Sequence, residues 1–159
     1  MNGVLELDKR DQFASMVIRD GEQLSLDMLV ASGHMDRNCV FPITERHLDA
    51  LRDHDRYLLL FAALHHPFQL AATELSPKEV ATYLDTILFA PEDEVEVFLT
   101  ELDHGRANGA ISNLVHIYSG ADRDPMRAGR WFHAWIAVGS FVSNVVLVPT
   151  RVPSPRTLR

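Results

Sequence analysis

The sequence predicts an α+β fold, a helix-dominated single domain with a small antiparallel sheet. Two β-compatible stretches, 13–19 and 23–30, flank the turn dipeptide Asp20-Gly21, an arrangement typical of a hairpin. Apolar residues then recur at helical spacing through most of 45–118. A chain of 159 residues with 47% hydrophobic content can bury one core of ordinary domain size. We therefore expect a single globular domain over residues 1–148.

The segment after the hairpin predicts a short strand that runs into a helix. Residues 31–38 have the character of a loop, and 39–43 form a brief apolar strand bounded by a proline. Thr44 suits the N-cap of a helical region that ends by His66, because Pro67 disfavours the α conformation before it. Polar residues at 53–55 interrupt the apolar stripe of this region, which indicates two helices.

Two further helices have clear start signals. Ser76, Pro77 and Glu79 combine a serine cap, a proline at the first helical position and a capping box. A second helix is expected to begin after Pro91 and to end near Gly105. In both helices an apolar stripe lies opposite a mostly acidic face.

The C-terminal third predicts two more helices, a strand and a tail. Residues 110–118 should be helical and end at Gly120, which suits a left-handed cap. The valine-rich run 141–148 predicts a buried strand, whereas 149–159, with its prolines and arginines, predicts an extended or disordered tail. A helix after Asp124-Pro125 is expected to carry four residues toward the core: Met126, Trp131, Trp135 and Val138.

Composition excludes several classes of protein. A formal charge of -7 would repel phosphate backbones and anionic lipid, which disfavours nucleic-acid and membrane partners and favours a basic protein. The single cysteine, Cys39, excludes an internal disulfide, and its apolar neighbours predict burial. Residues 1–20 lack the basic-then-apolar order of a secretory signal, and polar residues interrupt the apolar run 131–148. We therefore expect a cytoplasmic protein.

Acidic residues concentrate in one segment. Residues 74–103 contain nine acidic side chains and one basic side chain, Lys78. Such a face either keeps the protein soluble or docks a basic partner. Tyr83, on the polar side of the first of these helices, is either an aromatic anchor within the face or a core residue at its rim. The predicted partner-binding residues are Glu79, Tyr83, Asp85, Glu92, Asp93, Glu94, Glu96, Glu101 and Asp103.

No catalytic constellation is evident, so we expect a binding protein without a metal or cofactor. Among the eight histidines, no pair on a helix has the spacing of the zincin motif. His65-His66 suits a helix end, and His116 and His133 lie in apolar stretches that favour hydrogen-bonded core histidines. Phosphate-loop, dinucleotide and nucleophile-elbow motifs are also missing.

The chain resembles the immunity proteins of bacterial polymorphic-toxin and contact-dependent growth-inhibition (CDI) systems. The resemblance lies in its small acidic α+β character and in the stretches VFPIT at 40–44, HLDAL at 47–51 and YLLL at 57–60. It implies a protein that binds the C-terminal toxin domain of a CDI-type effector, often a basic nuclease, and blocks its active site or substrate groove. Acidic residues would then replace nucleic-acid phosphates.

Two other classes of function stay open. One is an adaptor or regulatory protein for a basic partner unrelated to toxins. The other is a small metal-dependent enzyme that uses the group His47, Asp49, His54 and Asp55.

Overall fold

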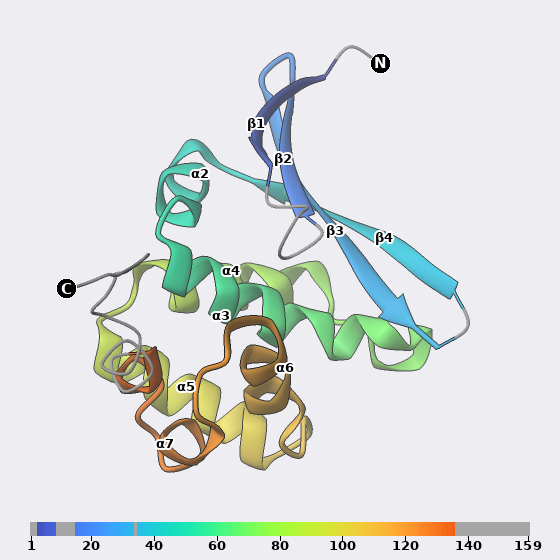
Figure 1. The fold of residues 1–159 in the computed structure, drawn as a ribbon. Coiled ribbons are helices and arrows are strands. Elements are labelled where there is room, and N and C mark those ends of the chain that lie inside the picture. Colours follow the sequence, from blue (N-terminus) through green and yellow to red (C-terminus); the bar gives the residue numbers. More distant parts are fainter. Residues whose placement is uncertain (1–2, 9–14, 34, 136–159) are drawn as a thin grey trace, which may run out of the picture.

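The computed structural model describes residues 3–8, 15–33 and 35–135 of the chain, and these form an α+β domain (Figure 1). An N-terminal antiparallel sheet is followed by helices, which confirms the predicted fold class. The sheet has the order β1-β2-β3-β4, with strands β1 (Val4–Asp8), β2 (Ser15–Asp20), β3 (Gln23–Ser32) and β4 (Met35–Ile43). The predicted strand 141–148, the tail 149–159 and Val138 lie outside the described residues.

The predicted hairpin is present as β2 and β3. Gly21 adopts the left-handed backbone that a two-residue turn requires, with φ of 65°. The loop predicted at 31–38 is wrong, because β3 continues to Ser32, β4 begins at Met35, and these two residues pair. The strand predicted at 39–43 is therefore only the second half of β4.

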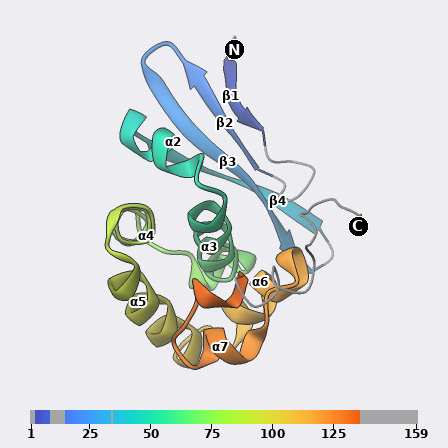
Figure 2. The ribbon, with the colours of Figure 1, turned by 60° about the vertical axis from the view of Figure 1, so that its left-hand side comes forward.

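Two helices follow the sheet, as predicted from the polar residues at 53–55 that interrupt the apolar stripe. They are α2 (Glu45–Leu51) and α3 (His54–His65). Thr44 caps α2 and Asp53 caps α3 by accepting hydrogen bonds from backbone N–H groups. Residues 57–65 are all buried, because the sheet lies on one side of α3 and the later helices lie on the other (Figures 1 and 2). Helix α3 is thus the centre of the core.

The remaining elements wrap around α3. They are the short 3₁₀ turns η1 (Pro67–Gln69) and η2 (Ala71–Thr73), and the helices α4 (Pro77–Phe89), α5 (Glu92–His104), α6 (Ala110–Ser119) and α7 (Arg123–Arg127). The capping box of α4 is present, with Ser76 and Glu79 as its two members. Gly120 ends α6 in the left-handed conformation, as expected, with φ of 77°.

The last predicted helix is shorter than expected. Helix α7 ends at Arg127, and the chain turns at Gly129, whose φ is 92°. Met126 and Trp131 are nevertheless buried, and Trp135 packs partly buried against the core. Within the described ranges, the helices are too short or too polar to cross a bilayer.

Candidate protein-binding surface on helix α5

The N-terminus of α5 presents a cluster of exposed carboxylates. Glu92, Asp93 and Glu94 occupy its first turn and are all exposed. Anionic side chains are favoured at this end of a helix by the helix dipole, so the local fold tolerates the concentration of charge. Pro91 at the N-cap offers no side-chain hydrogen bond, which leaves the acidic residues to complement the free N–H groups.

An apolar residue lies in the middle of the acidic face. Asp93, Val97 and Glu101 are four residues apart along α5, so they share one stripe of its surface. The side chain of Val97 is 59% exposed. It separates two shallow hollows, one of about 400 Å³ on the α4 side and one of about 210 Å³ toward Gly129. The first hollow is lined by Thr86, Asp93, Glu94, Val97, Phe98 and Glu101.

The acidic face extends beyond α5 to the start of α3. Burial raises the pKa of Asp55, and the negative charges of Asp53 and Glu92 raise it further. Glu92 of α5 therefore lies close enough to α3 for its charge to raise the pKa of Asp55. In the sequence Asp55 belongs to a different candidate group, with His47, Asp49 and His54, because no local signal indicates that the N-termini of α3 and α5 lie close together.

Three of the predicted acidic residues are committed to internal contacts. Glu79 completes the α4 capping box and forms an ion pair of 3.5 Å with Arg106. The pKa of Glu79 is lowered, mainly because its carboxylate accepts a hydrogen bond from the backbone N–H of Ser76. Glu96 accepts a 3.0 Å hydrogen bond from the backbone N–H of Phe132. Asp85 bonds to His47 across two helices at 2.9 Å.

Asp103 was expected on the solvent side, and that placement is wrong, whereas for Tyr83 the structure shows the second of its two alternatives, a core residue. Tyr83 is 6% exposed and packs edge-on against Phe98 with ring centroids 5.3 Å apart. Asp103 is 1% exposed, and its Oδ1 accepts 3.0 Å hydrogen bonds from the backbone N–H groups of Ile111 and Ser112. Neither residue is therefore an external contact of the isolated chain.

Four acidic residues remain available to a partner: Glu92, Asp93, Glu94 and Glu101. Across the described part of the chain, no basic side chain forms an ion pair with any of them. Arg56 lies near the start of α5, but its guanidinium donates to the carbonyl oxygens of Ile87 and Ala90 at the end of α4. We call Val97 and these four carboxylates the α5 surface.

The alternative histidine group does not converge on a metal site. His47 is buried in α2, whereas His54 begins α3. Residues 3–8, 15–33 and 35–135 contain no group of three or more histidine, cysteine or acidic side chains placed to hold a metal ion.

The other singled-out residues are mostly structural. Cys39 is buried as predicted, and burial raises the pKa of its thiol. The carbonyl oxygen of Ala121 can only accept, so Nδ1 of His116, 2.9 Å away, carries a proton and donates it. The expectation that His133 is a core histidine is wrong, because this residue is exposed.

Comparison with known proteins places the chain in a family without assigning an activity. The model of a family of unknown function, DUF6357, matches residues 2–140, and the chain belongs to that family. Neither the curated proteins nor the solved structures provide a match.

Proposed function

We propose that this member of DUF6357 is an immunity protein, which binds a cationic toxin domain through the α5 surface and thereby neutralises it. One observation carries this proposal: an exposed apolar side chain, Val97, lies between two hollows bordered by carboxylates that form no ion pair with any described residue. Like charges held together in this way destabilise the isolated fold by a few tenths of a kcal/mol per pair. A cationic partner would relieve that repulsion.

The two kinds of residue on the surface have different tasks in this proposal. The carboxylates steer a basic partner toward the surface, which raises the association rate at low salt. Val97 and the adjoining side chain of Phe98 supply the apolar contact that slows dissociation. Such a division predicts strong salt dependence of the association rate and weak salt dependence of the dissociation rate.

The identification of the partner as a toxin domain comes from the resemblance to immunity proteins. A nuclease would present the basic groove that normally binds nucleic-acid phosphates, and the acidic face would occupy it. An adaptor role with a different basic partner uses the same surface, so only the consequence for cell survival separates the two.

The test combines survival with association kinetics. The chain is co-expressed with cationic toxin domains encoded by the gene directly upstream of its own, and the complex is purified. With the wild-type chain we expect the cells to survive and a stable complex to be purified. At about 50 mM salt the triple variant E92K/D93K/E101K should associate with the toxin domain at least about tenfold more slowly than wild type. This difference should shrink at about 500 mM salt.

A matched triple variant, D20K/E22K/D49K, reverses three exposed acidic residues away from α5 and controls for net charge. Equal association rates for the two triple variants would remove the α5 surface from the proposal. Binding without protection of the cells would replace the toxin by another basic partner.

A further inference from the structure

Strand β4 lies at one edge of the sheet. Within residues 3–8, 15–33 and 35–135 it is the last strand in the sheet order and pairs with β3 alone. Pro42 lies opposite Ser25 and has no N–H to exchange, so this pair occupies a non-hydrogen-bonded position of the ladder, and the antiparallel alternation then directs the N–H and C=O groups of Asn38 and Val40 away from β3. Pro42, which has no N–H to donate, lies at the next outward position.

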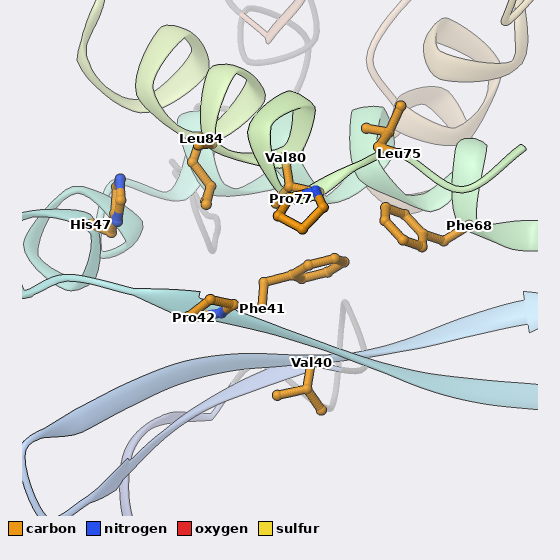
Figure 3. A pocket seen from close by; sticks show the side chains of 10 residues that line it. Val40, Phe41, Pro42, His47, Phe68, Leu75, Pro77, Val80 and Leu84 are labelled. Carbon is orange, nitrogen blue, oxygen red and sulfur yellow. The ribbon is translucent and has the colours of Figure 1, made fainter.

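An apolar groove of about 280 Å³ lies beside this free edge, between β4 and α4. Figure 3 shows the side chain of Phe41 rising from β4 toward Val80 and Leu84 of α4, with His47 at one end and Phe68 and Leu75 at the other. Val40 points to the opposite side of the strand, where its side chain is 59% exposed. The groove therefore lies along the strand whose outward hydrogen-bonding groups have no partner among the residues that the structure describes.

We propose that this groove binds an extended segment of a partner protein, which adds to the edge of β4 as a fifth strand and inserts an apolar side chain beside Phe41. Side chains of directly opposed residues lie on the same face of a sheet, so the residue opposite Phe41 projects into the groove and its two neighbours project outward beside Val40 and Pro42.

The free edge decides in favour of a peptide over a small apolar molecule. A peptide strand satisfies the outward N–H and C=O groups of β4 and fills the groove at the same time, which is the mode of β-strand addition. The devices that blunt an edge lie toward the two ends of β4, with the charged residues Asp36 and Arg37 near its start and Pro42 near its end, so the stretch 38–41 between them carries none.

Charge at the end of the groove fits a basic segment. Asp85, which bonds His47 through Oδ1, has a side chain that is 64% exposed. A basic residue that follows the inserted apolar residue would meet this carboxylate. The groove and the α5 surface share no lining residue, although both adjoin α4, so each can be tested without the other.

The probe is a phage-displayed library of random peptides about 12 residues long, a length that exceeds the free edge. The purified full chain is the bait, and the enriched peptides are synthesised. Ala81→Trp fills the groove from an exposed position on α4. Its control is Thr82→Trp, which adds the same bulk at the next position, also exposed but outside the groove lining. Val40→Pro removes an outward N–H without touching the bonds to β3.

We expect enriched peptides to have one apolar residue between polar or β-branched neighbours. Their affinity should fall at least about tenfold with Ala81→Trp and with Val40→Pro, and should be unchanged with Thr82→Trp and with E92K/D93K/E101K. Peptide binding should also slow hydrogen exchange at the amides of Asn38 and Val40 in the wild-type chain.

Three results would overturn the proposal. They are a library that yields no enriched sequence, enriched peptides that bind Ala81→Trp and Val40→Pro as well as wild type, and a dimer of this chain that Val40→Pro dissociates. The last would identify a second copy as the occupant of the edge. If E92K/D93K/E101K loses toxin binding but keeps peptide binding, the α5 surface and the groove are two independent binding sites.

Discussion

The imidazole of His47 on α2 and the carboxylate of Asp85 on α4 are joined by a 2.9 Å hydrogen bond. The other ring nitrogen, Nδ1, accepts a 3.0 Å hydrogen bond from the backbone N–H of Thr44. Nε2 therefore carries a proton and donates it to Asp85. The same ring stacks on Phe89 at a centroid distance of 5.2 Å. His47 thus completes the capping box of α2 and fastens this helix to α4.

Asp85→Ala should lower the free energy of unfolding by about 1 kcal/mol, because the buried His47 loses its acceptor. Asp85→Asn keeps an acceptor oxygen and should cost less than half of that. Urea denaturation measures both values. Equal losses for the two variants would show that the charge of Asp85 matters and that the hydrogen bond does not.

Asp103→Ala should be more damaging, at about 2 kcal/mol, because it removes the buried acceptor for two backbone N–H groups at the start of α6. The expected signature is local as well: hydrogen exchange should accelerate at Ile111 and Ser112 more than in α3. Binding of a cationic partner to the remaining folded protein should be unaffected. A slower association rate with Asp103→Asn would contradict the assignment of this residue to the interior.

For Tyr83 and Asp103, residue type and spacing indicate different environments. Their polar groups are typical of the solvent side, whereas Tyr83 lies three residues after Val80 and four before Ile87, which is the spacing of a buried stripe. Asp103 likewise follows the buried Val95 and Leu99 at intervals of four. Spacing alone predicts both burials. The cap that Asp103 provides for α6 involves a turn of the chain that spacing does not reveal.

Local signals predicted the helices well and the sheet edge poorly. Caps such as Thr44 and Ser76 act over three residues, so the sequence specifies them directly. The first half of β4 has no apolar alternation, and its inward residue Arg37 is held by an ion pair with Glu74 and a 2.9 Å bond to the carbonyl oxygen of Phe68. Those contacts come from distant segments. The sequence does not predict the groove beside β4, or the effect of Glu92 on the pKa of Asp55, because both depend on segments that are distant along the chain.

Asp55→Asn should stabilise the fold near neutral pH, by at most about 0.5 kcal/mol because solvent screens this partly exposed carboxyl. The pKa of Asp55 is raised in the folded protein, so the folded state holds its proton more strongly than the unfolded state, and stability falls as pH rises through the range between the two pKa values. The variant and wild type should converge below about pH 3, where the carboxyl is protonated in both states. Thermal denaturation across this range measures the difference, and Asp49→Asn, at an exposed position, is the control. A variant less stable than wild type at neutral pH would contradict the direction of the shift.

His65 should make the protein sensitive to mild acid. Burial is the main cause of its lowered pKa, the neighbouring His66 lowers it further, and the charge of Asp36 partly opposes both. Because the folded pKa lies below the ordinary value of 6.5, the unfolded chain takes up the proton first. Stability is therefore fully present above that value and declines as pH falls toward the folded pKa.

His65→Leu should remove this decline while keeping the volume of the side chain, which packs 5.3 Å from the ring of Phe61. The loss of stability in wild type should exceed that of the variant by at most about 1.4 kcal/mol per pH unit between roughly pH 6.5 and 5, the limit for one proton. Urea denaturation at several pH values measures the two slopes. His133→Gln replaces an exposed histidine and should keep the wild-type slope. If His65→Leu also keeps that slope, the proton taken up on unfolding belongs to another group.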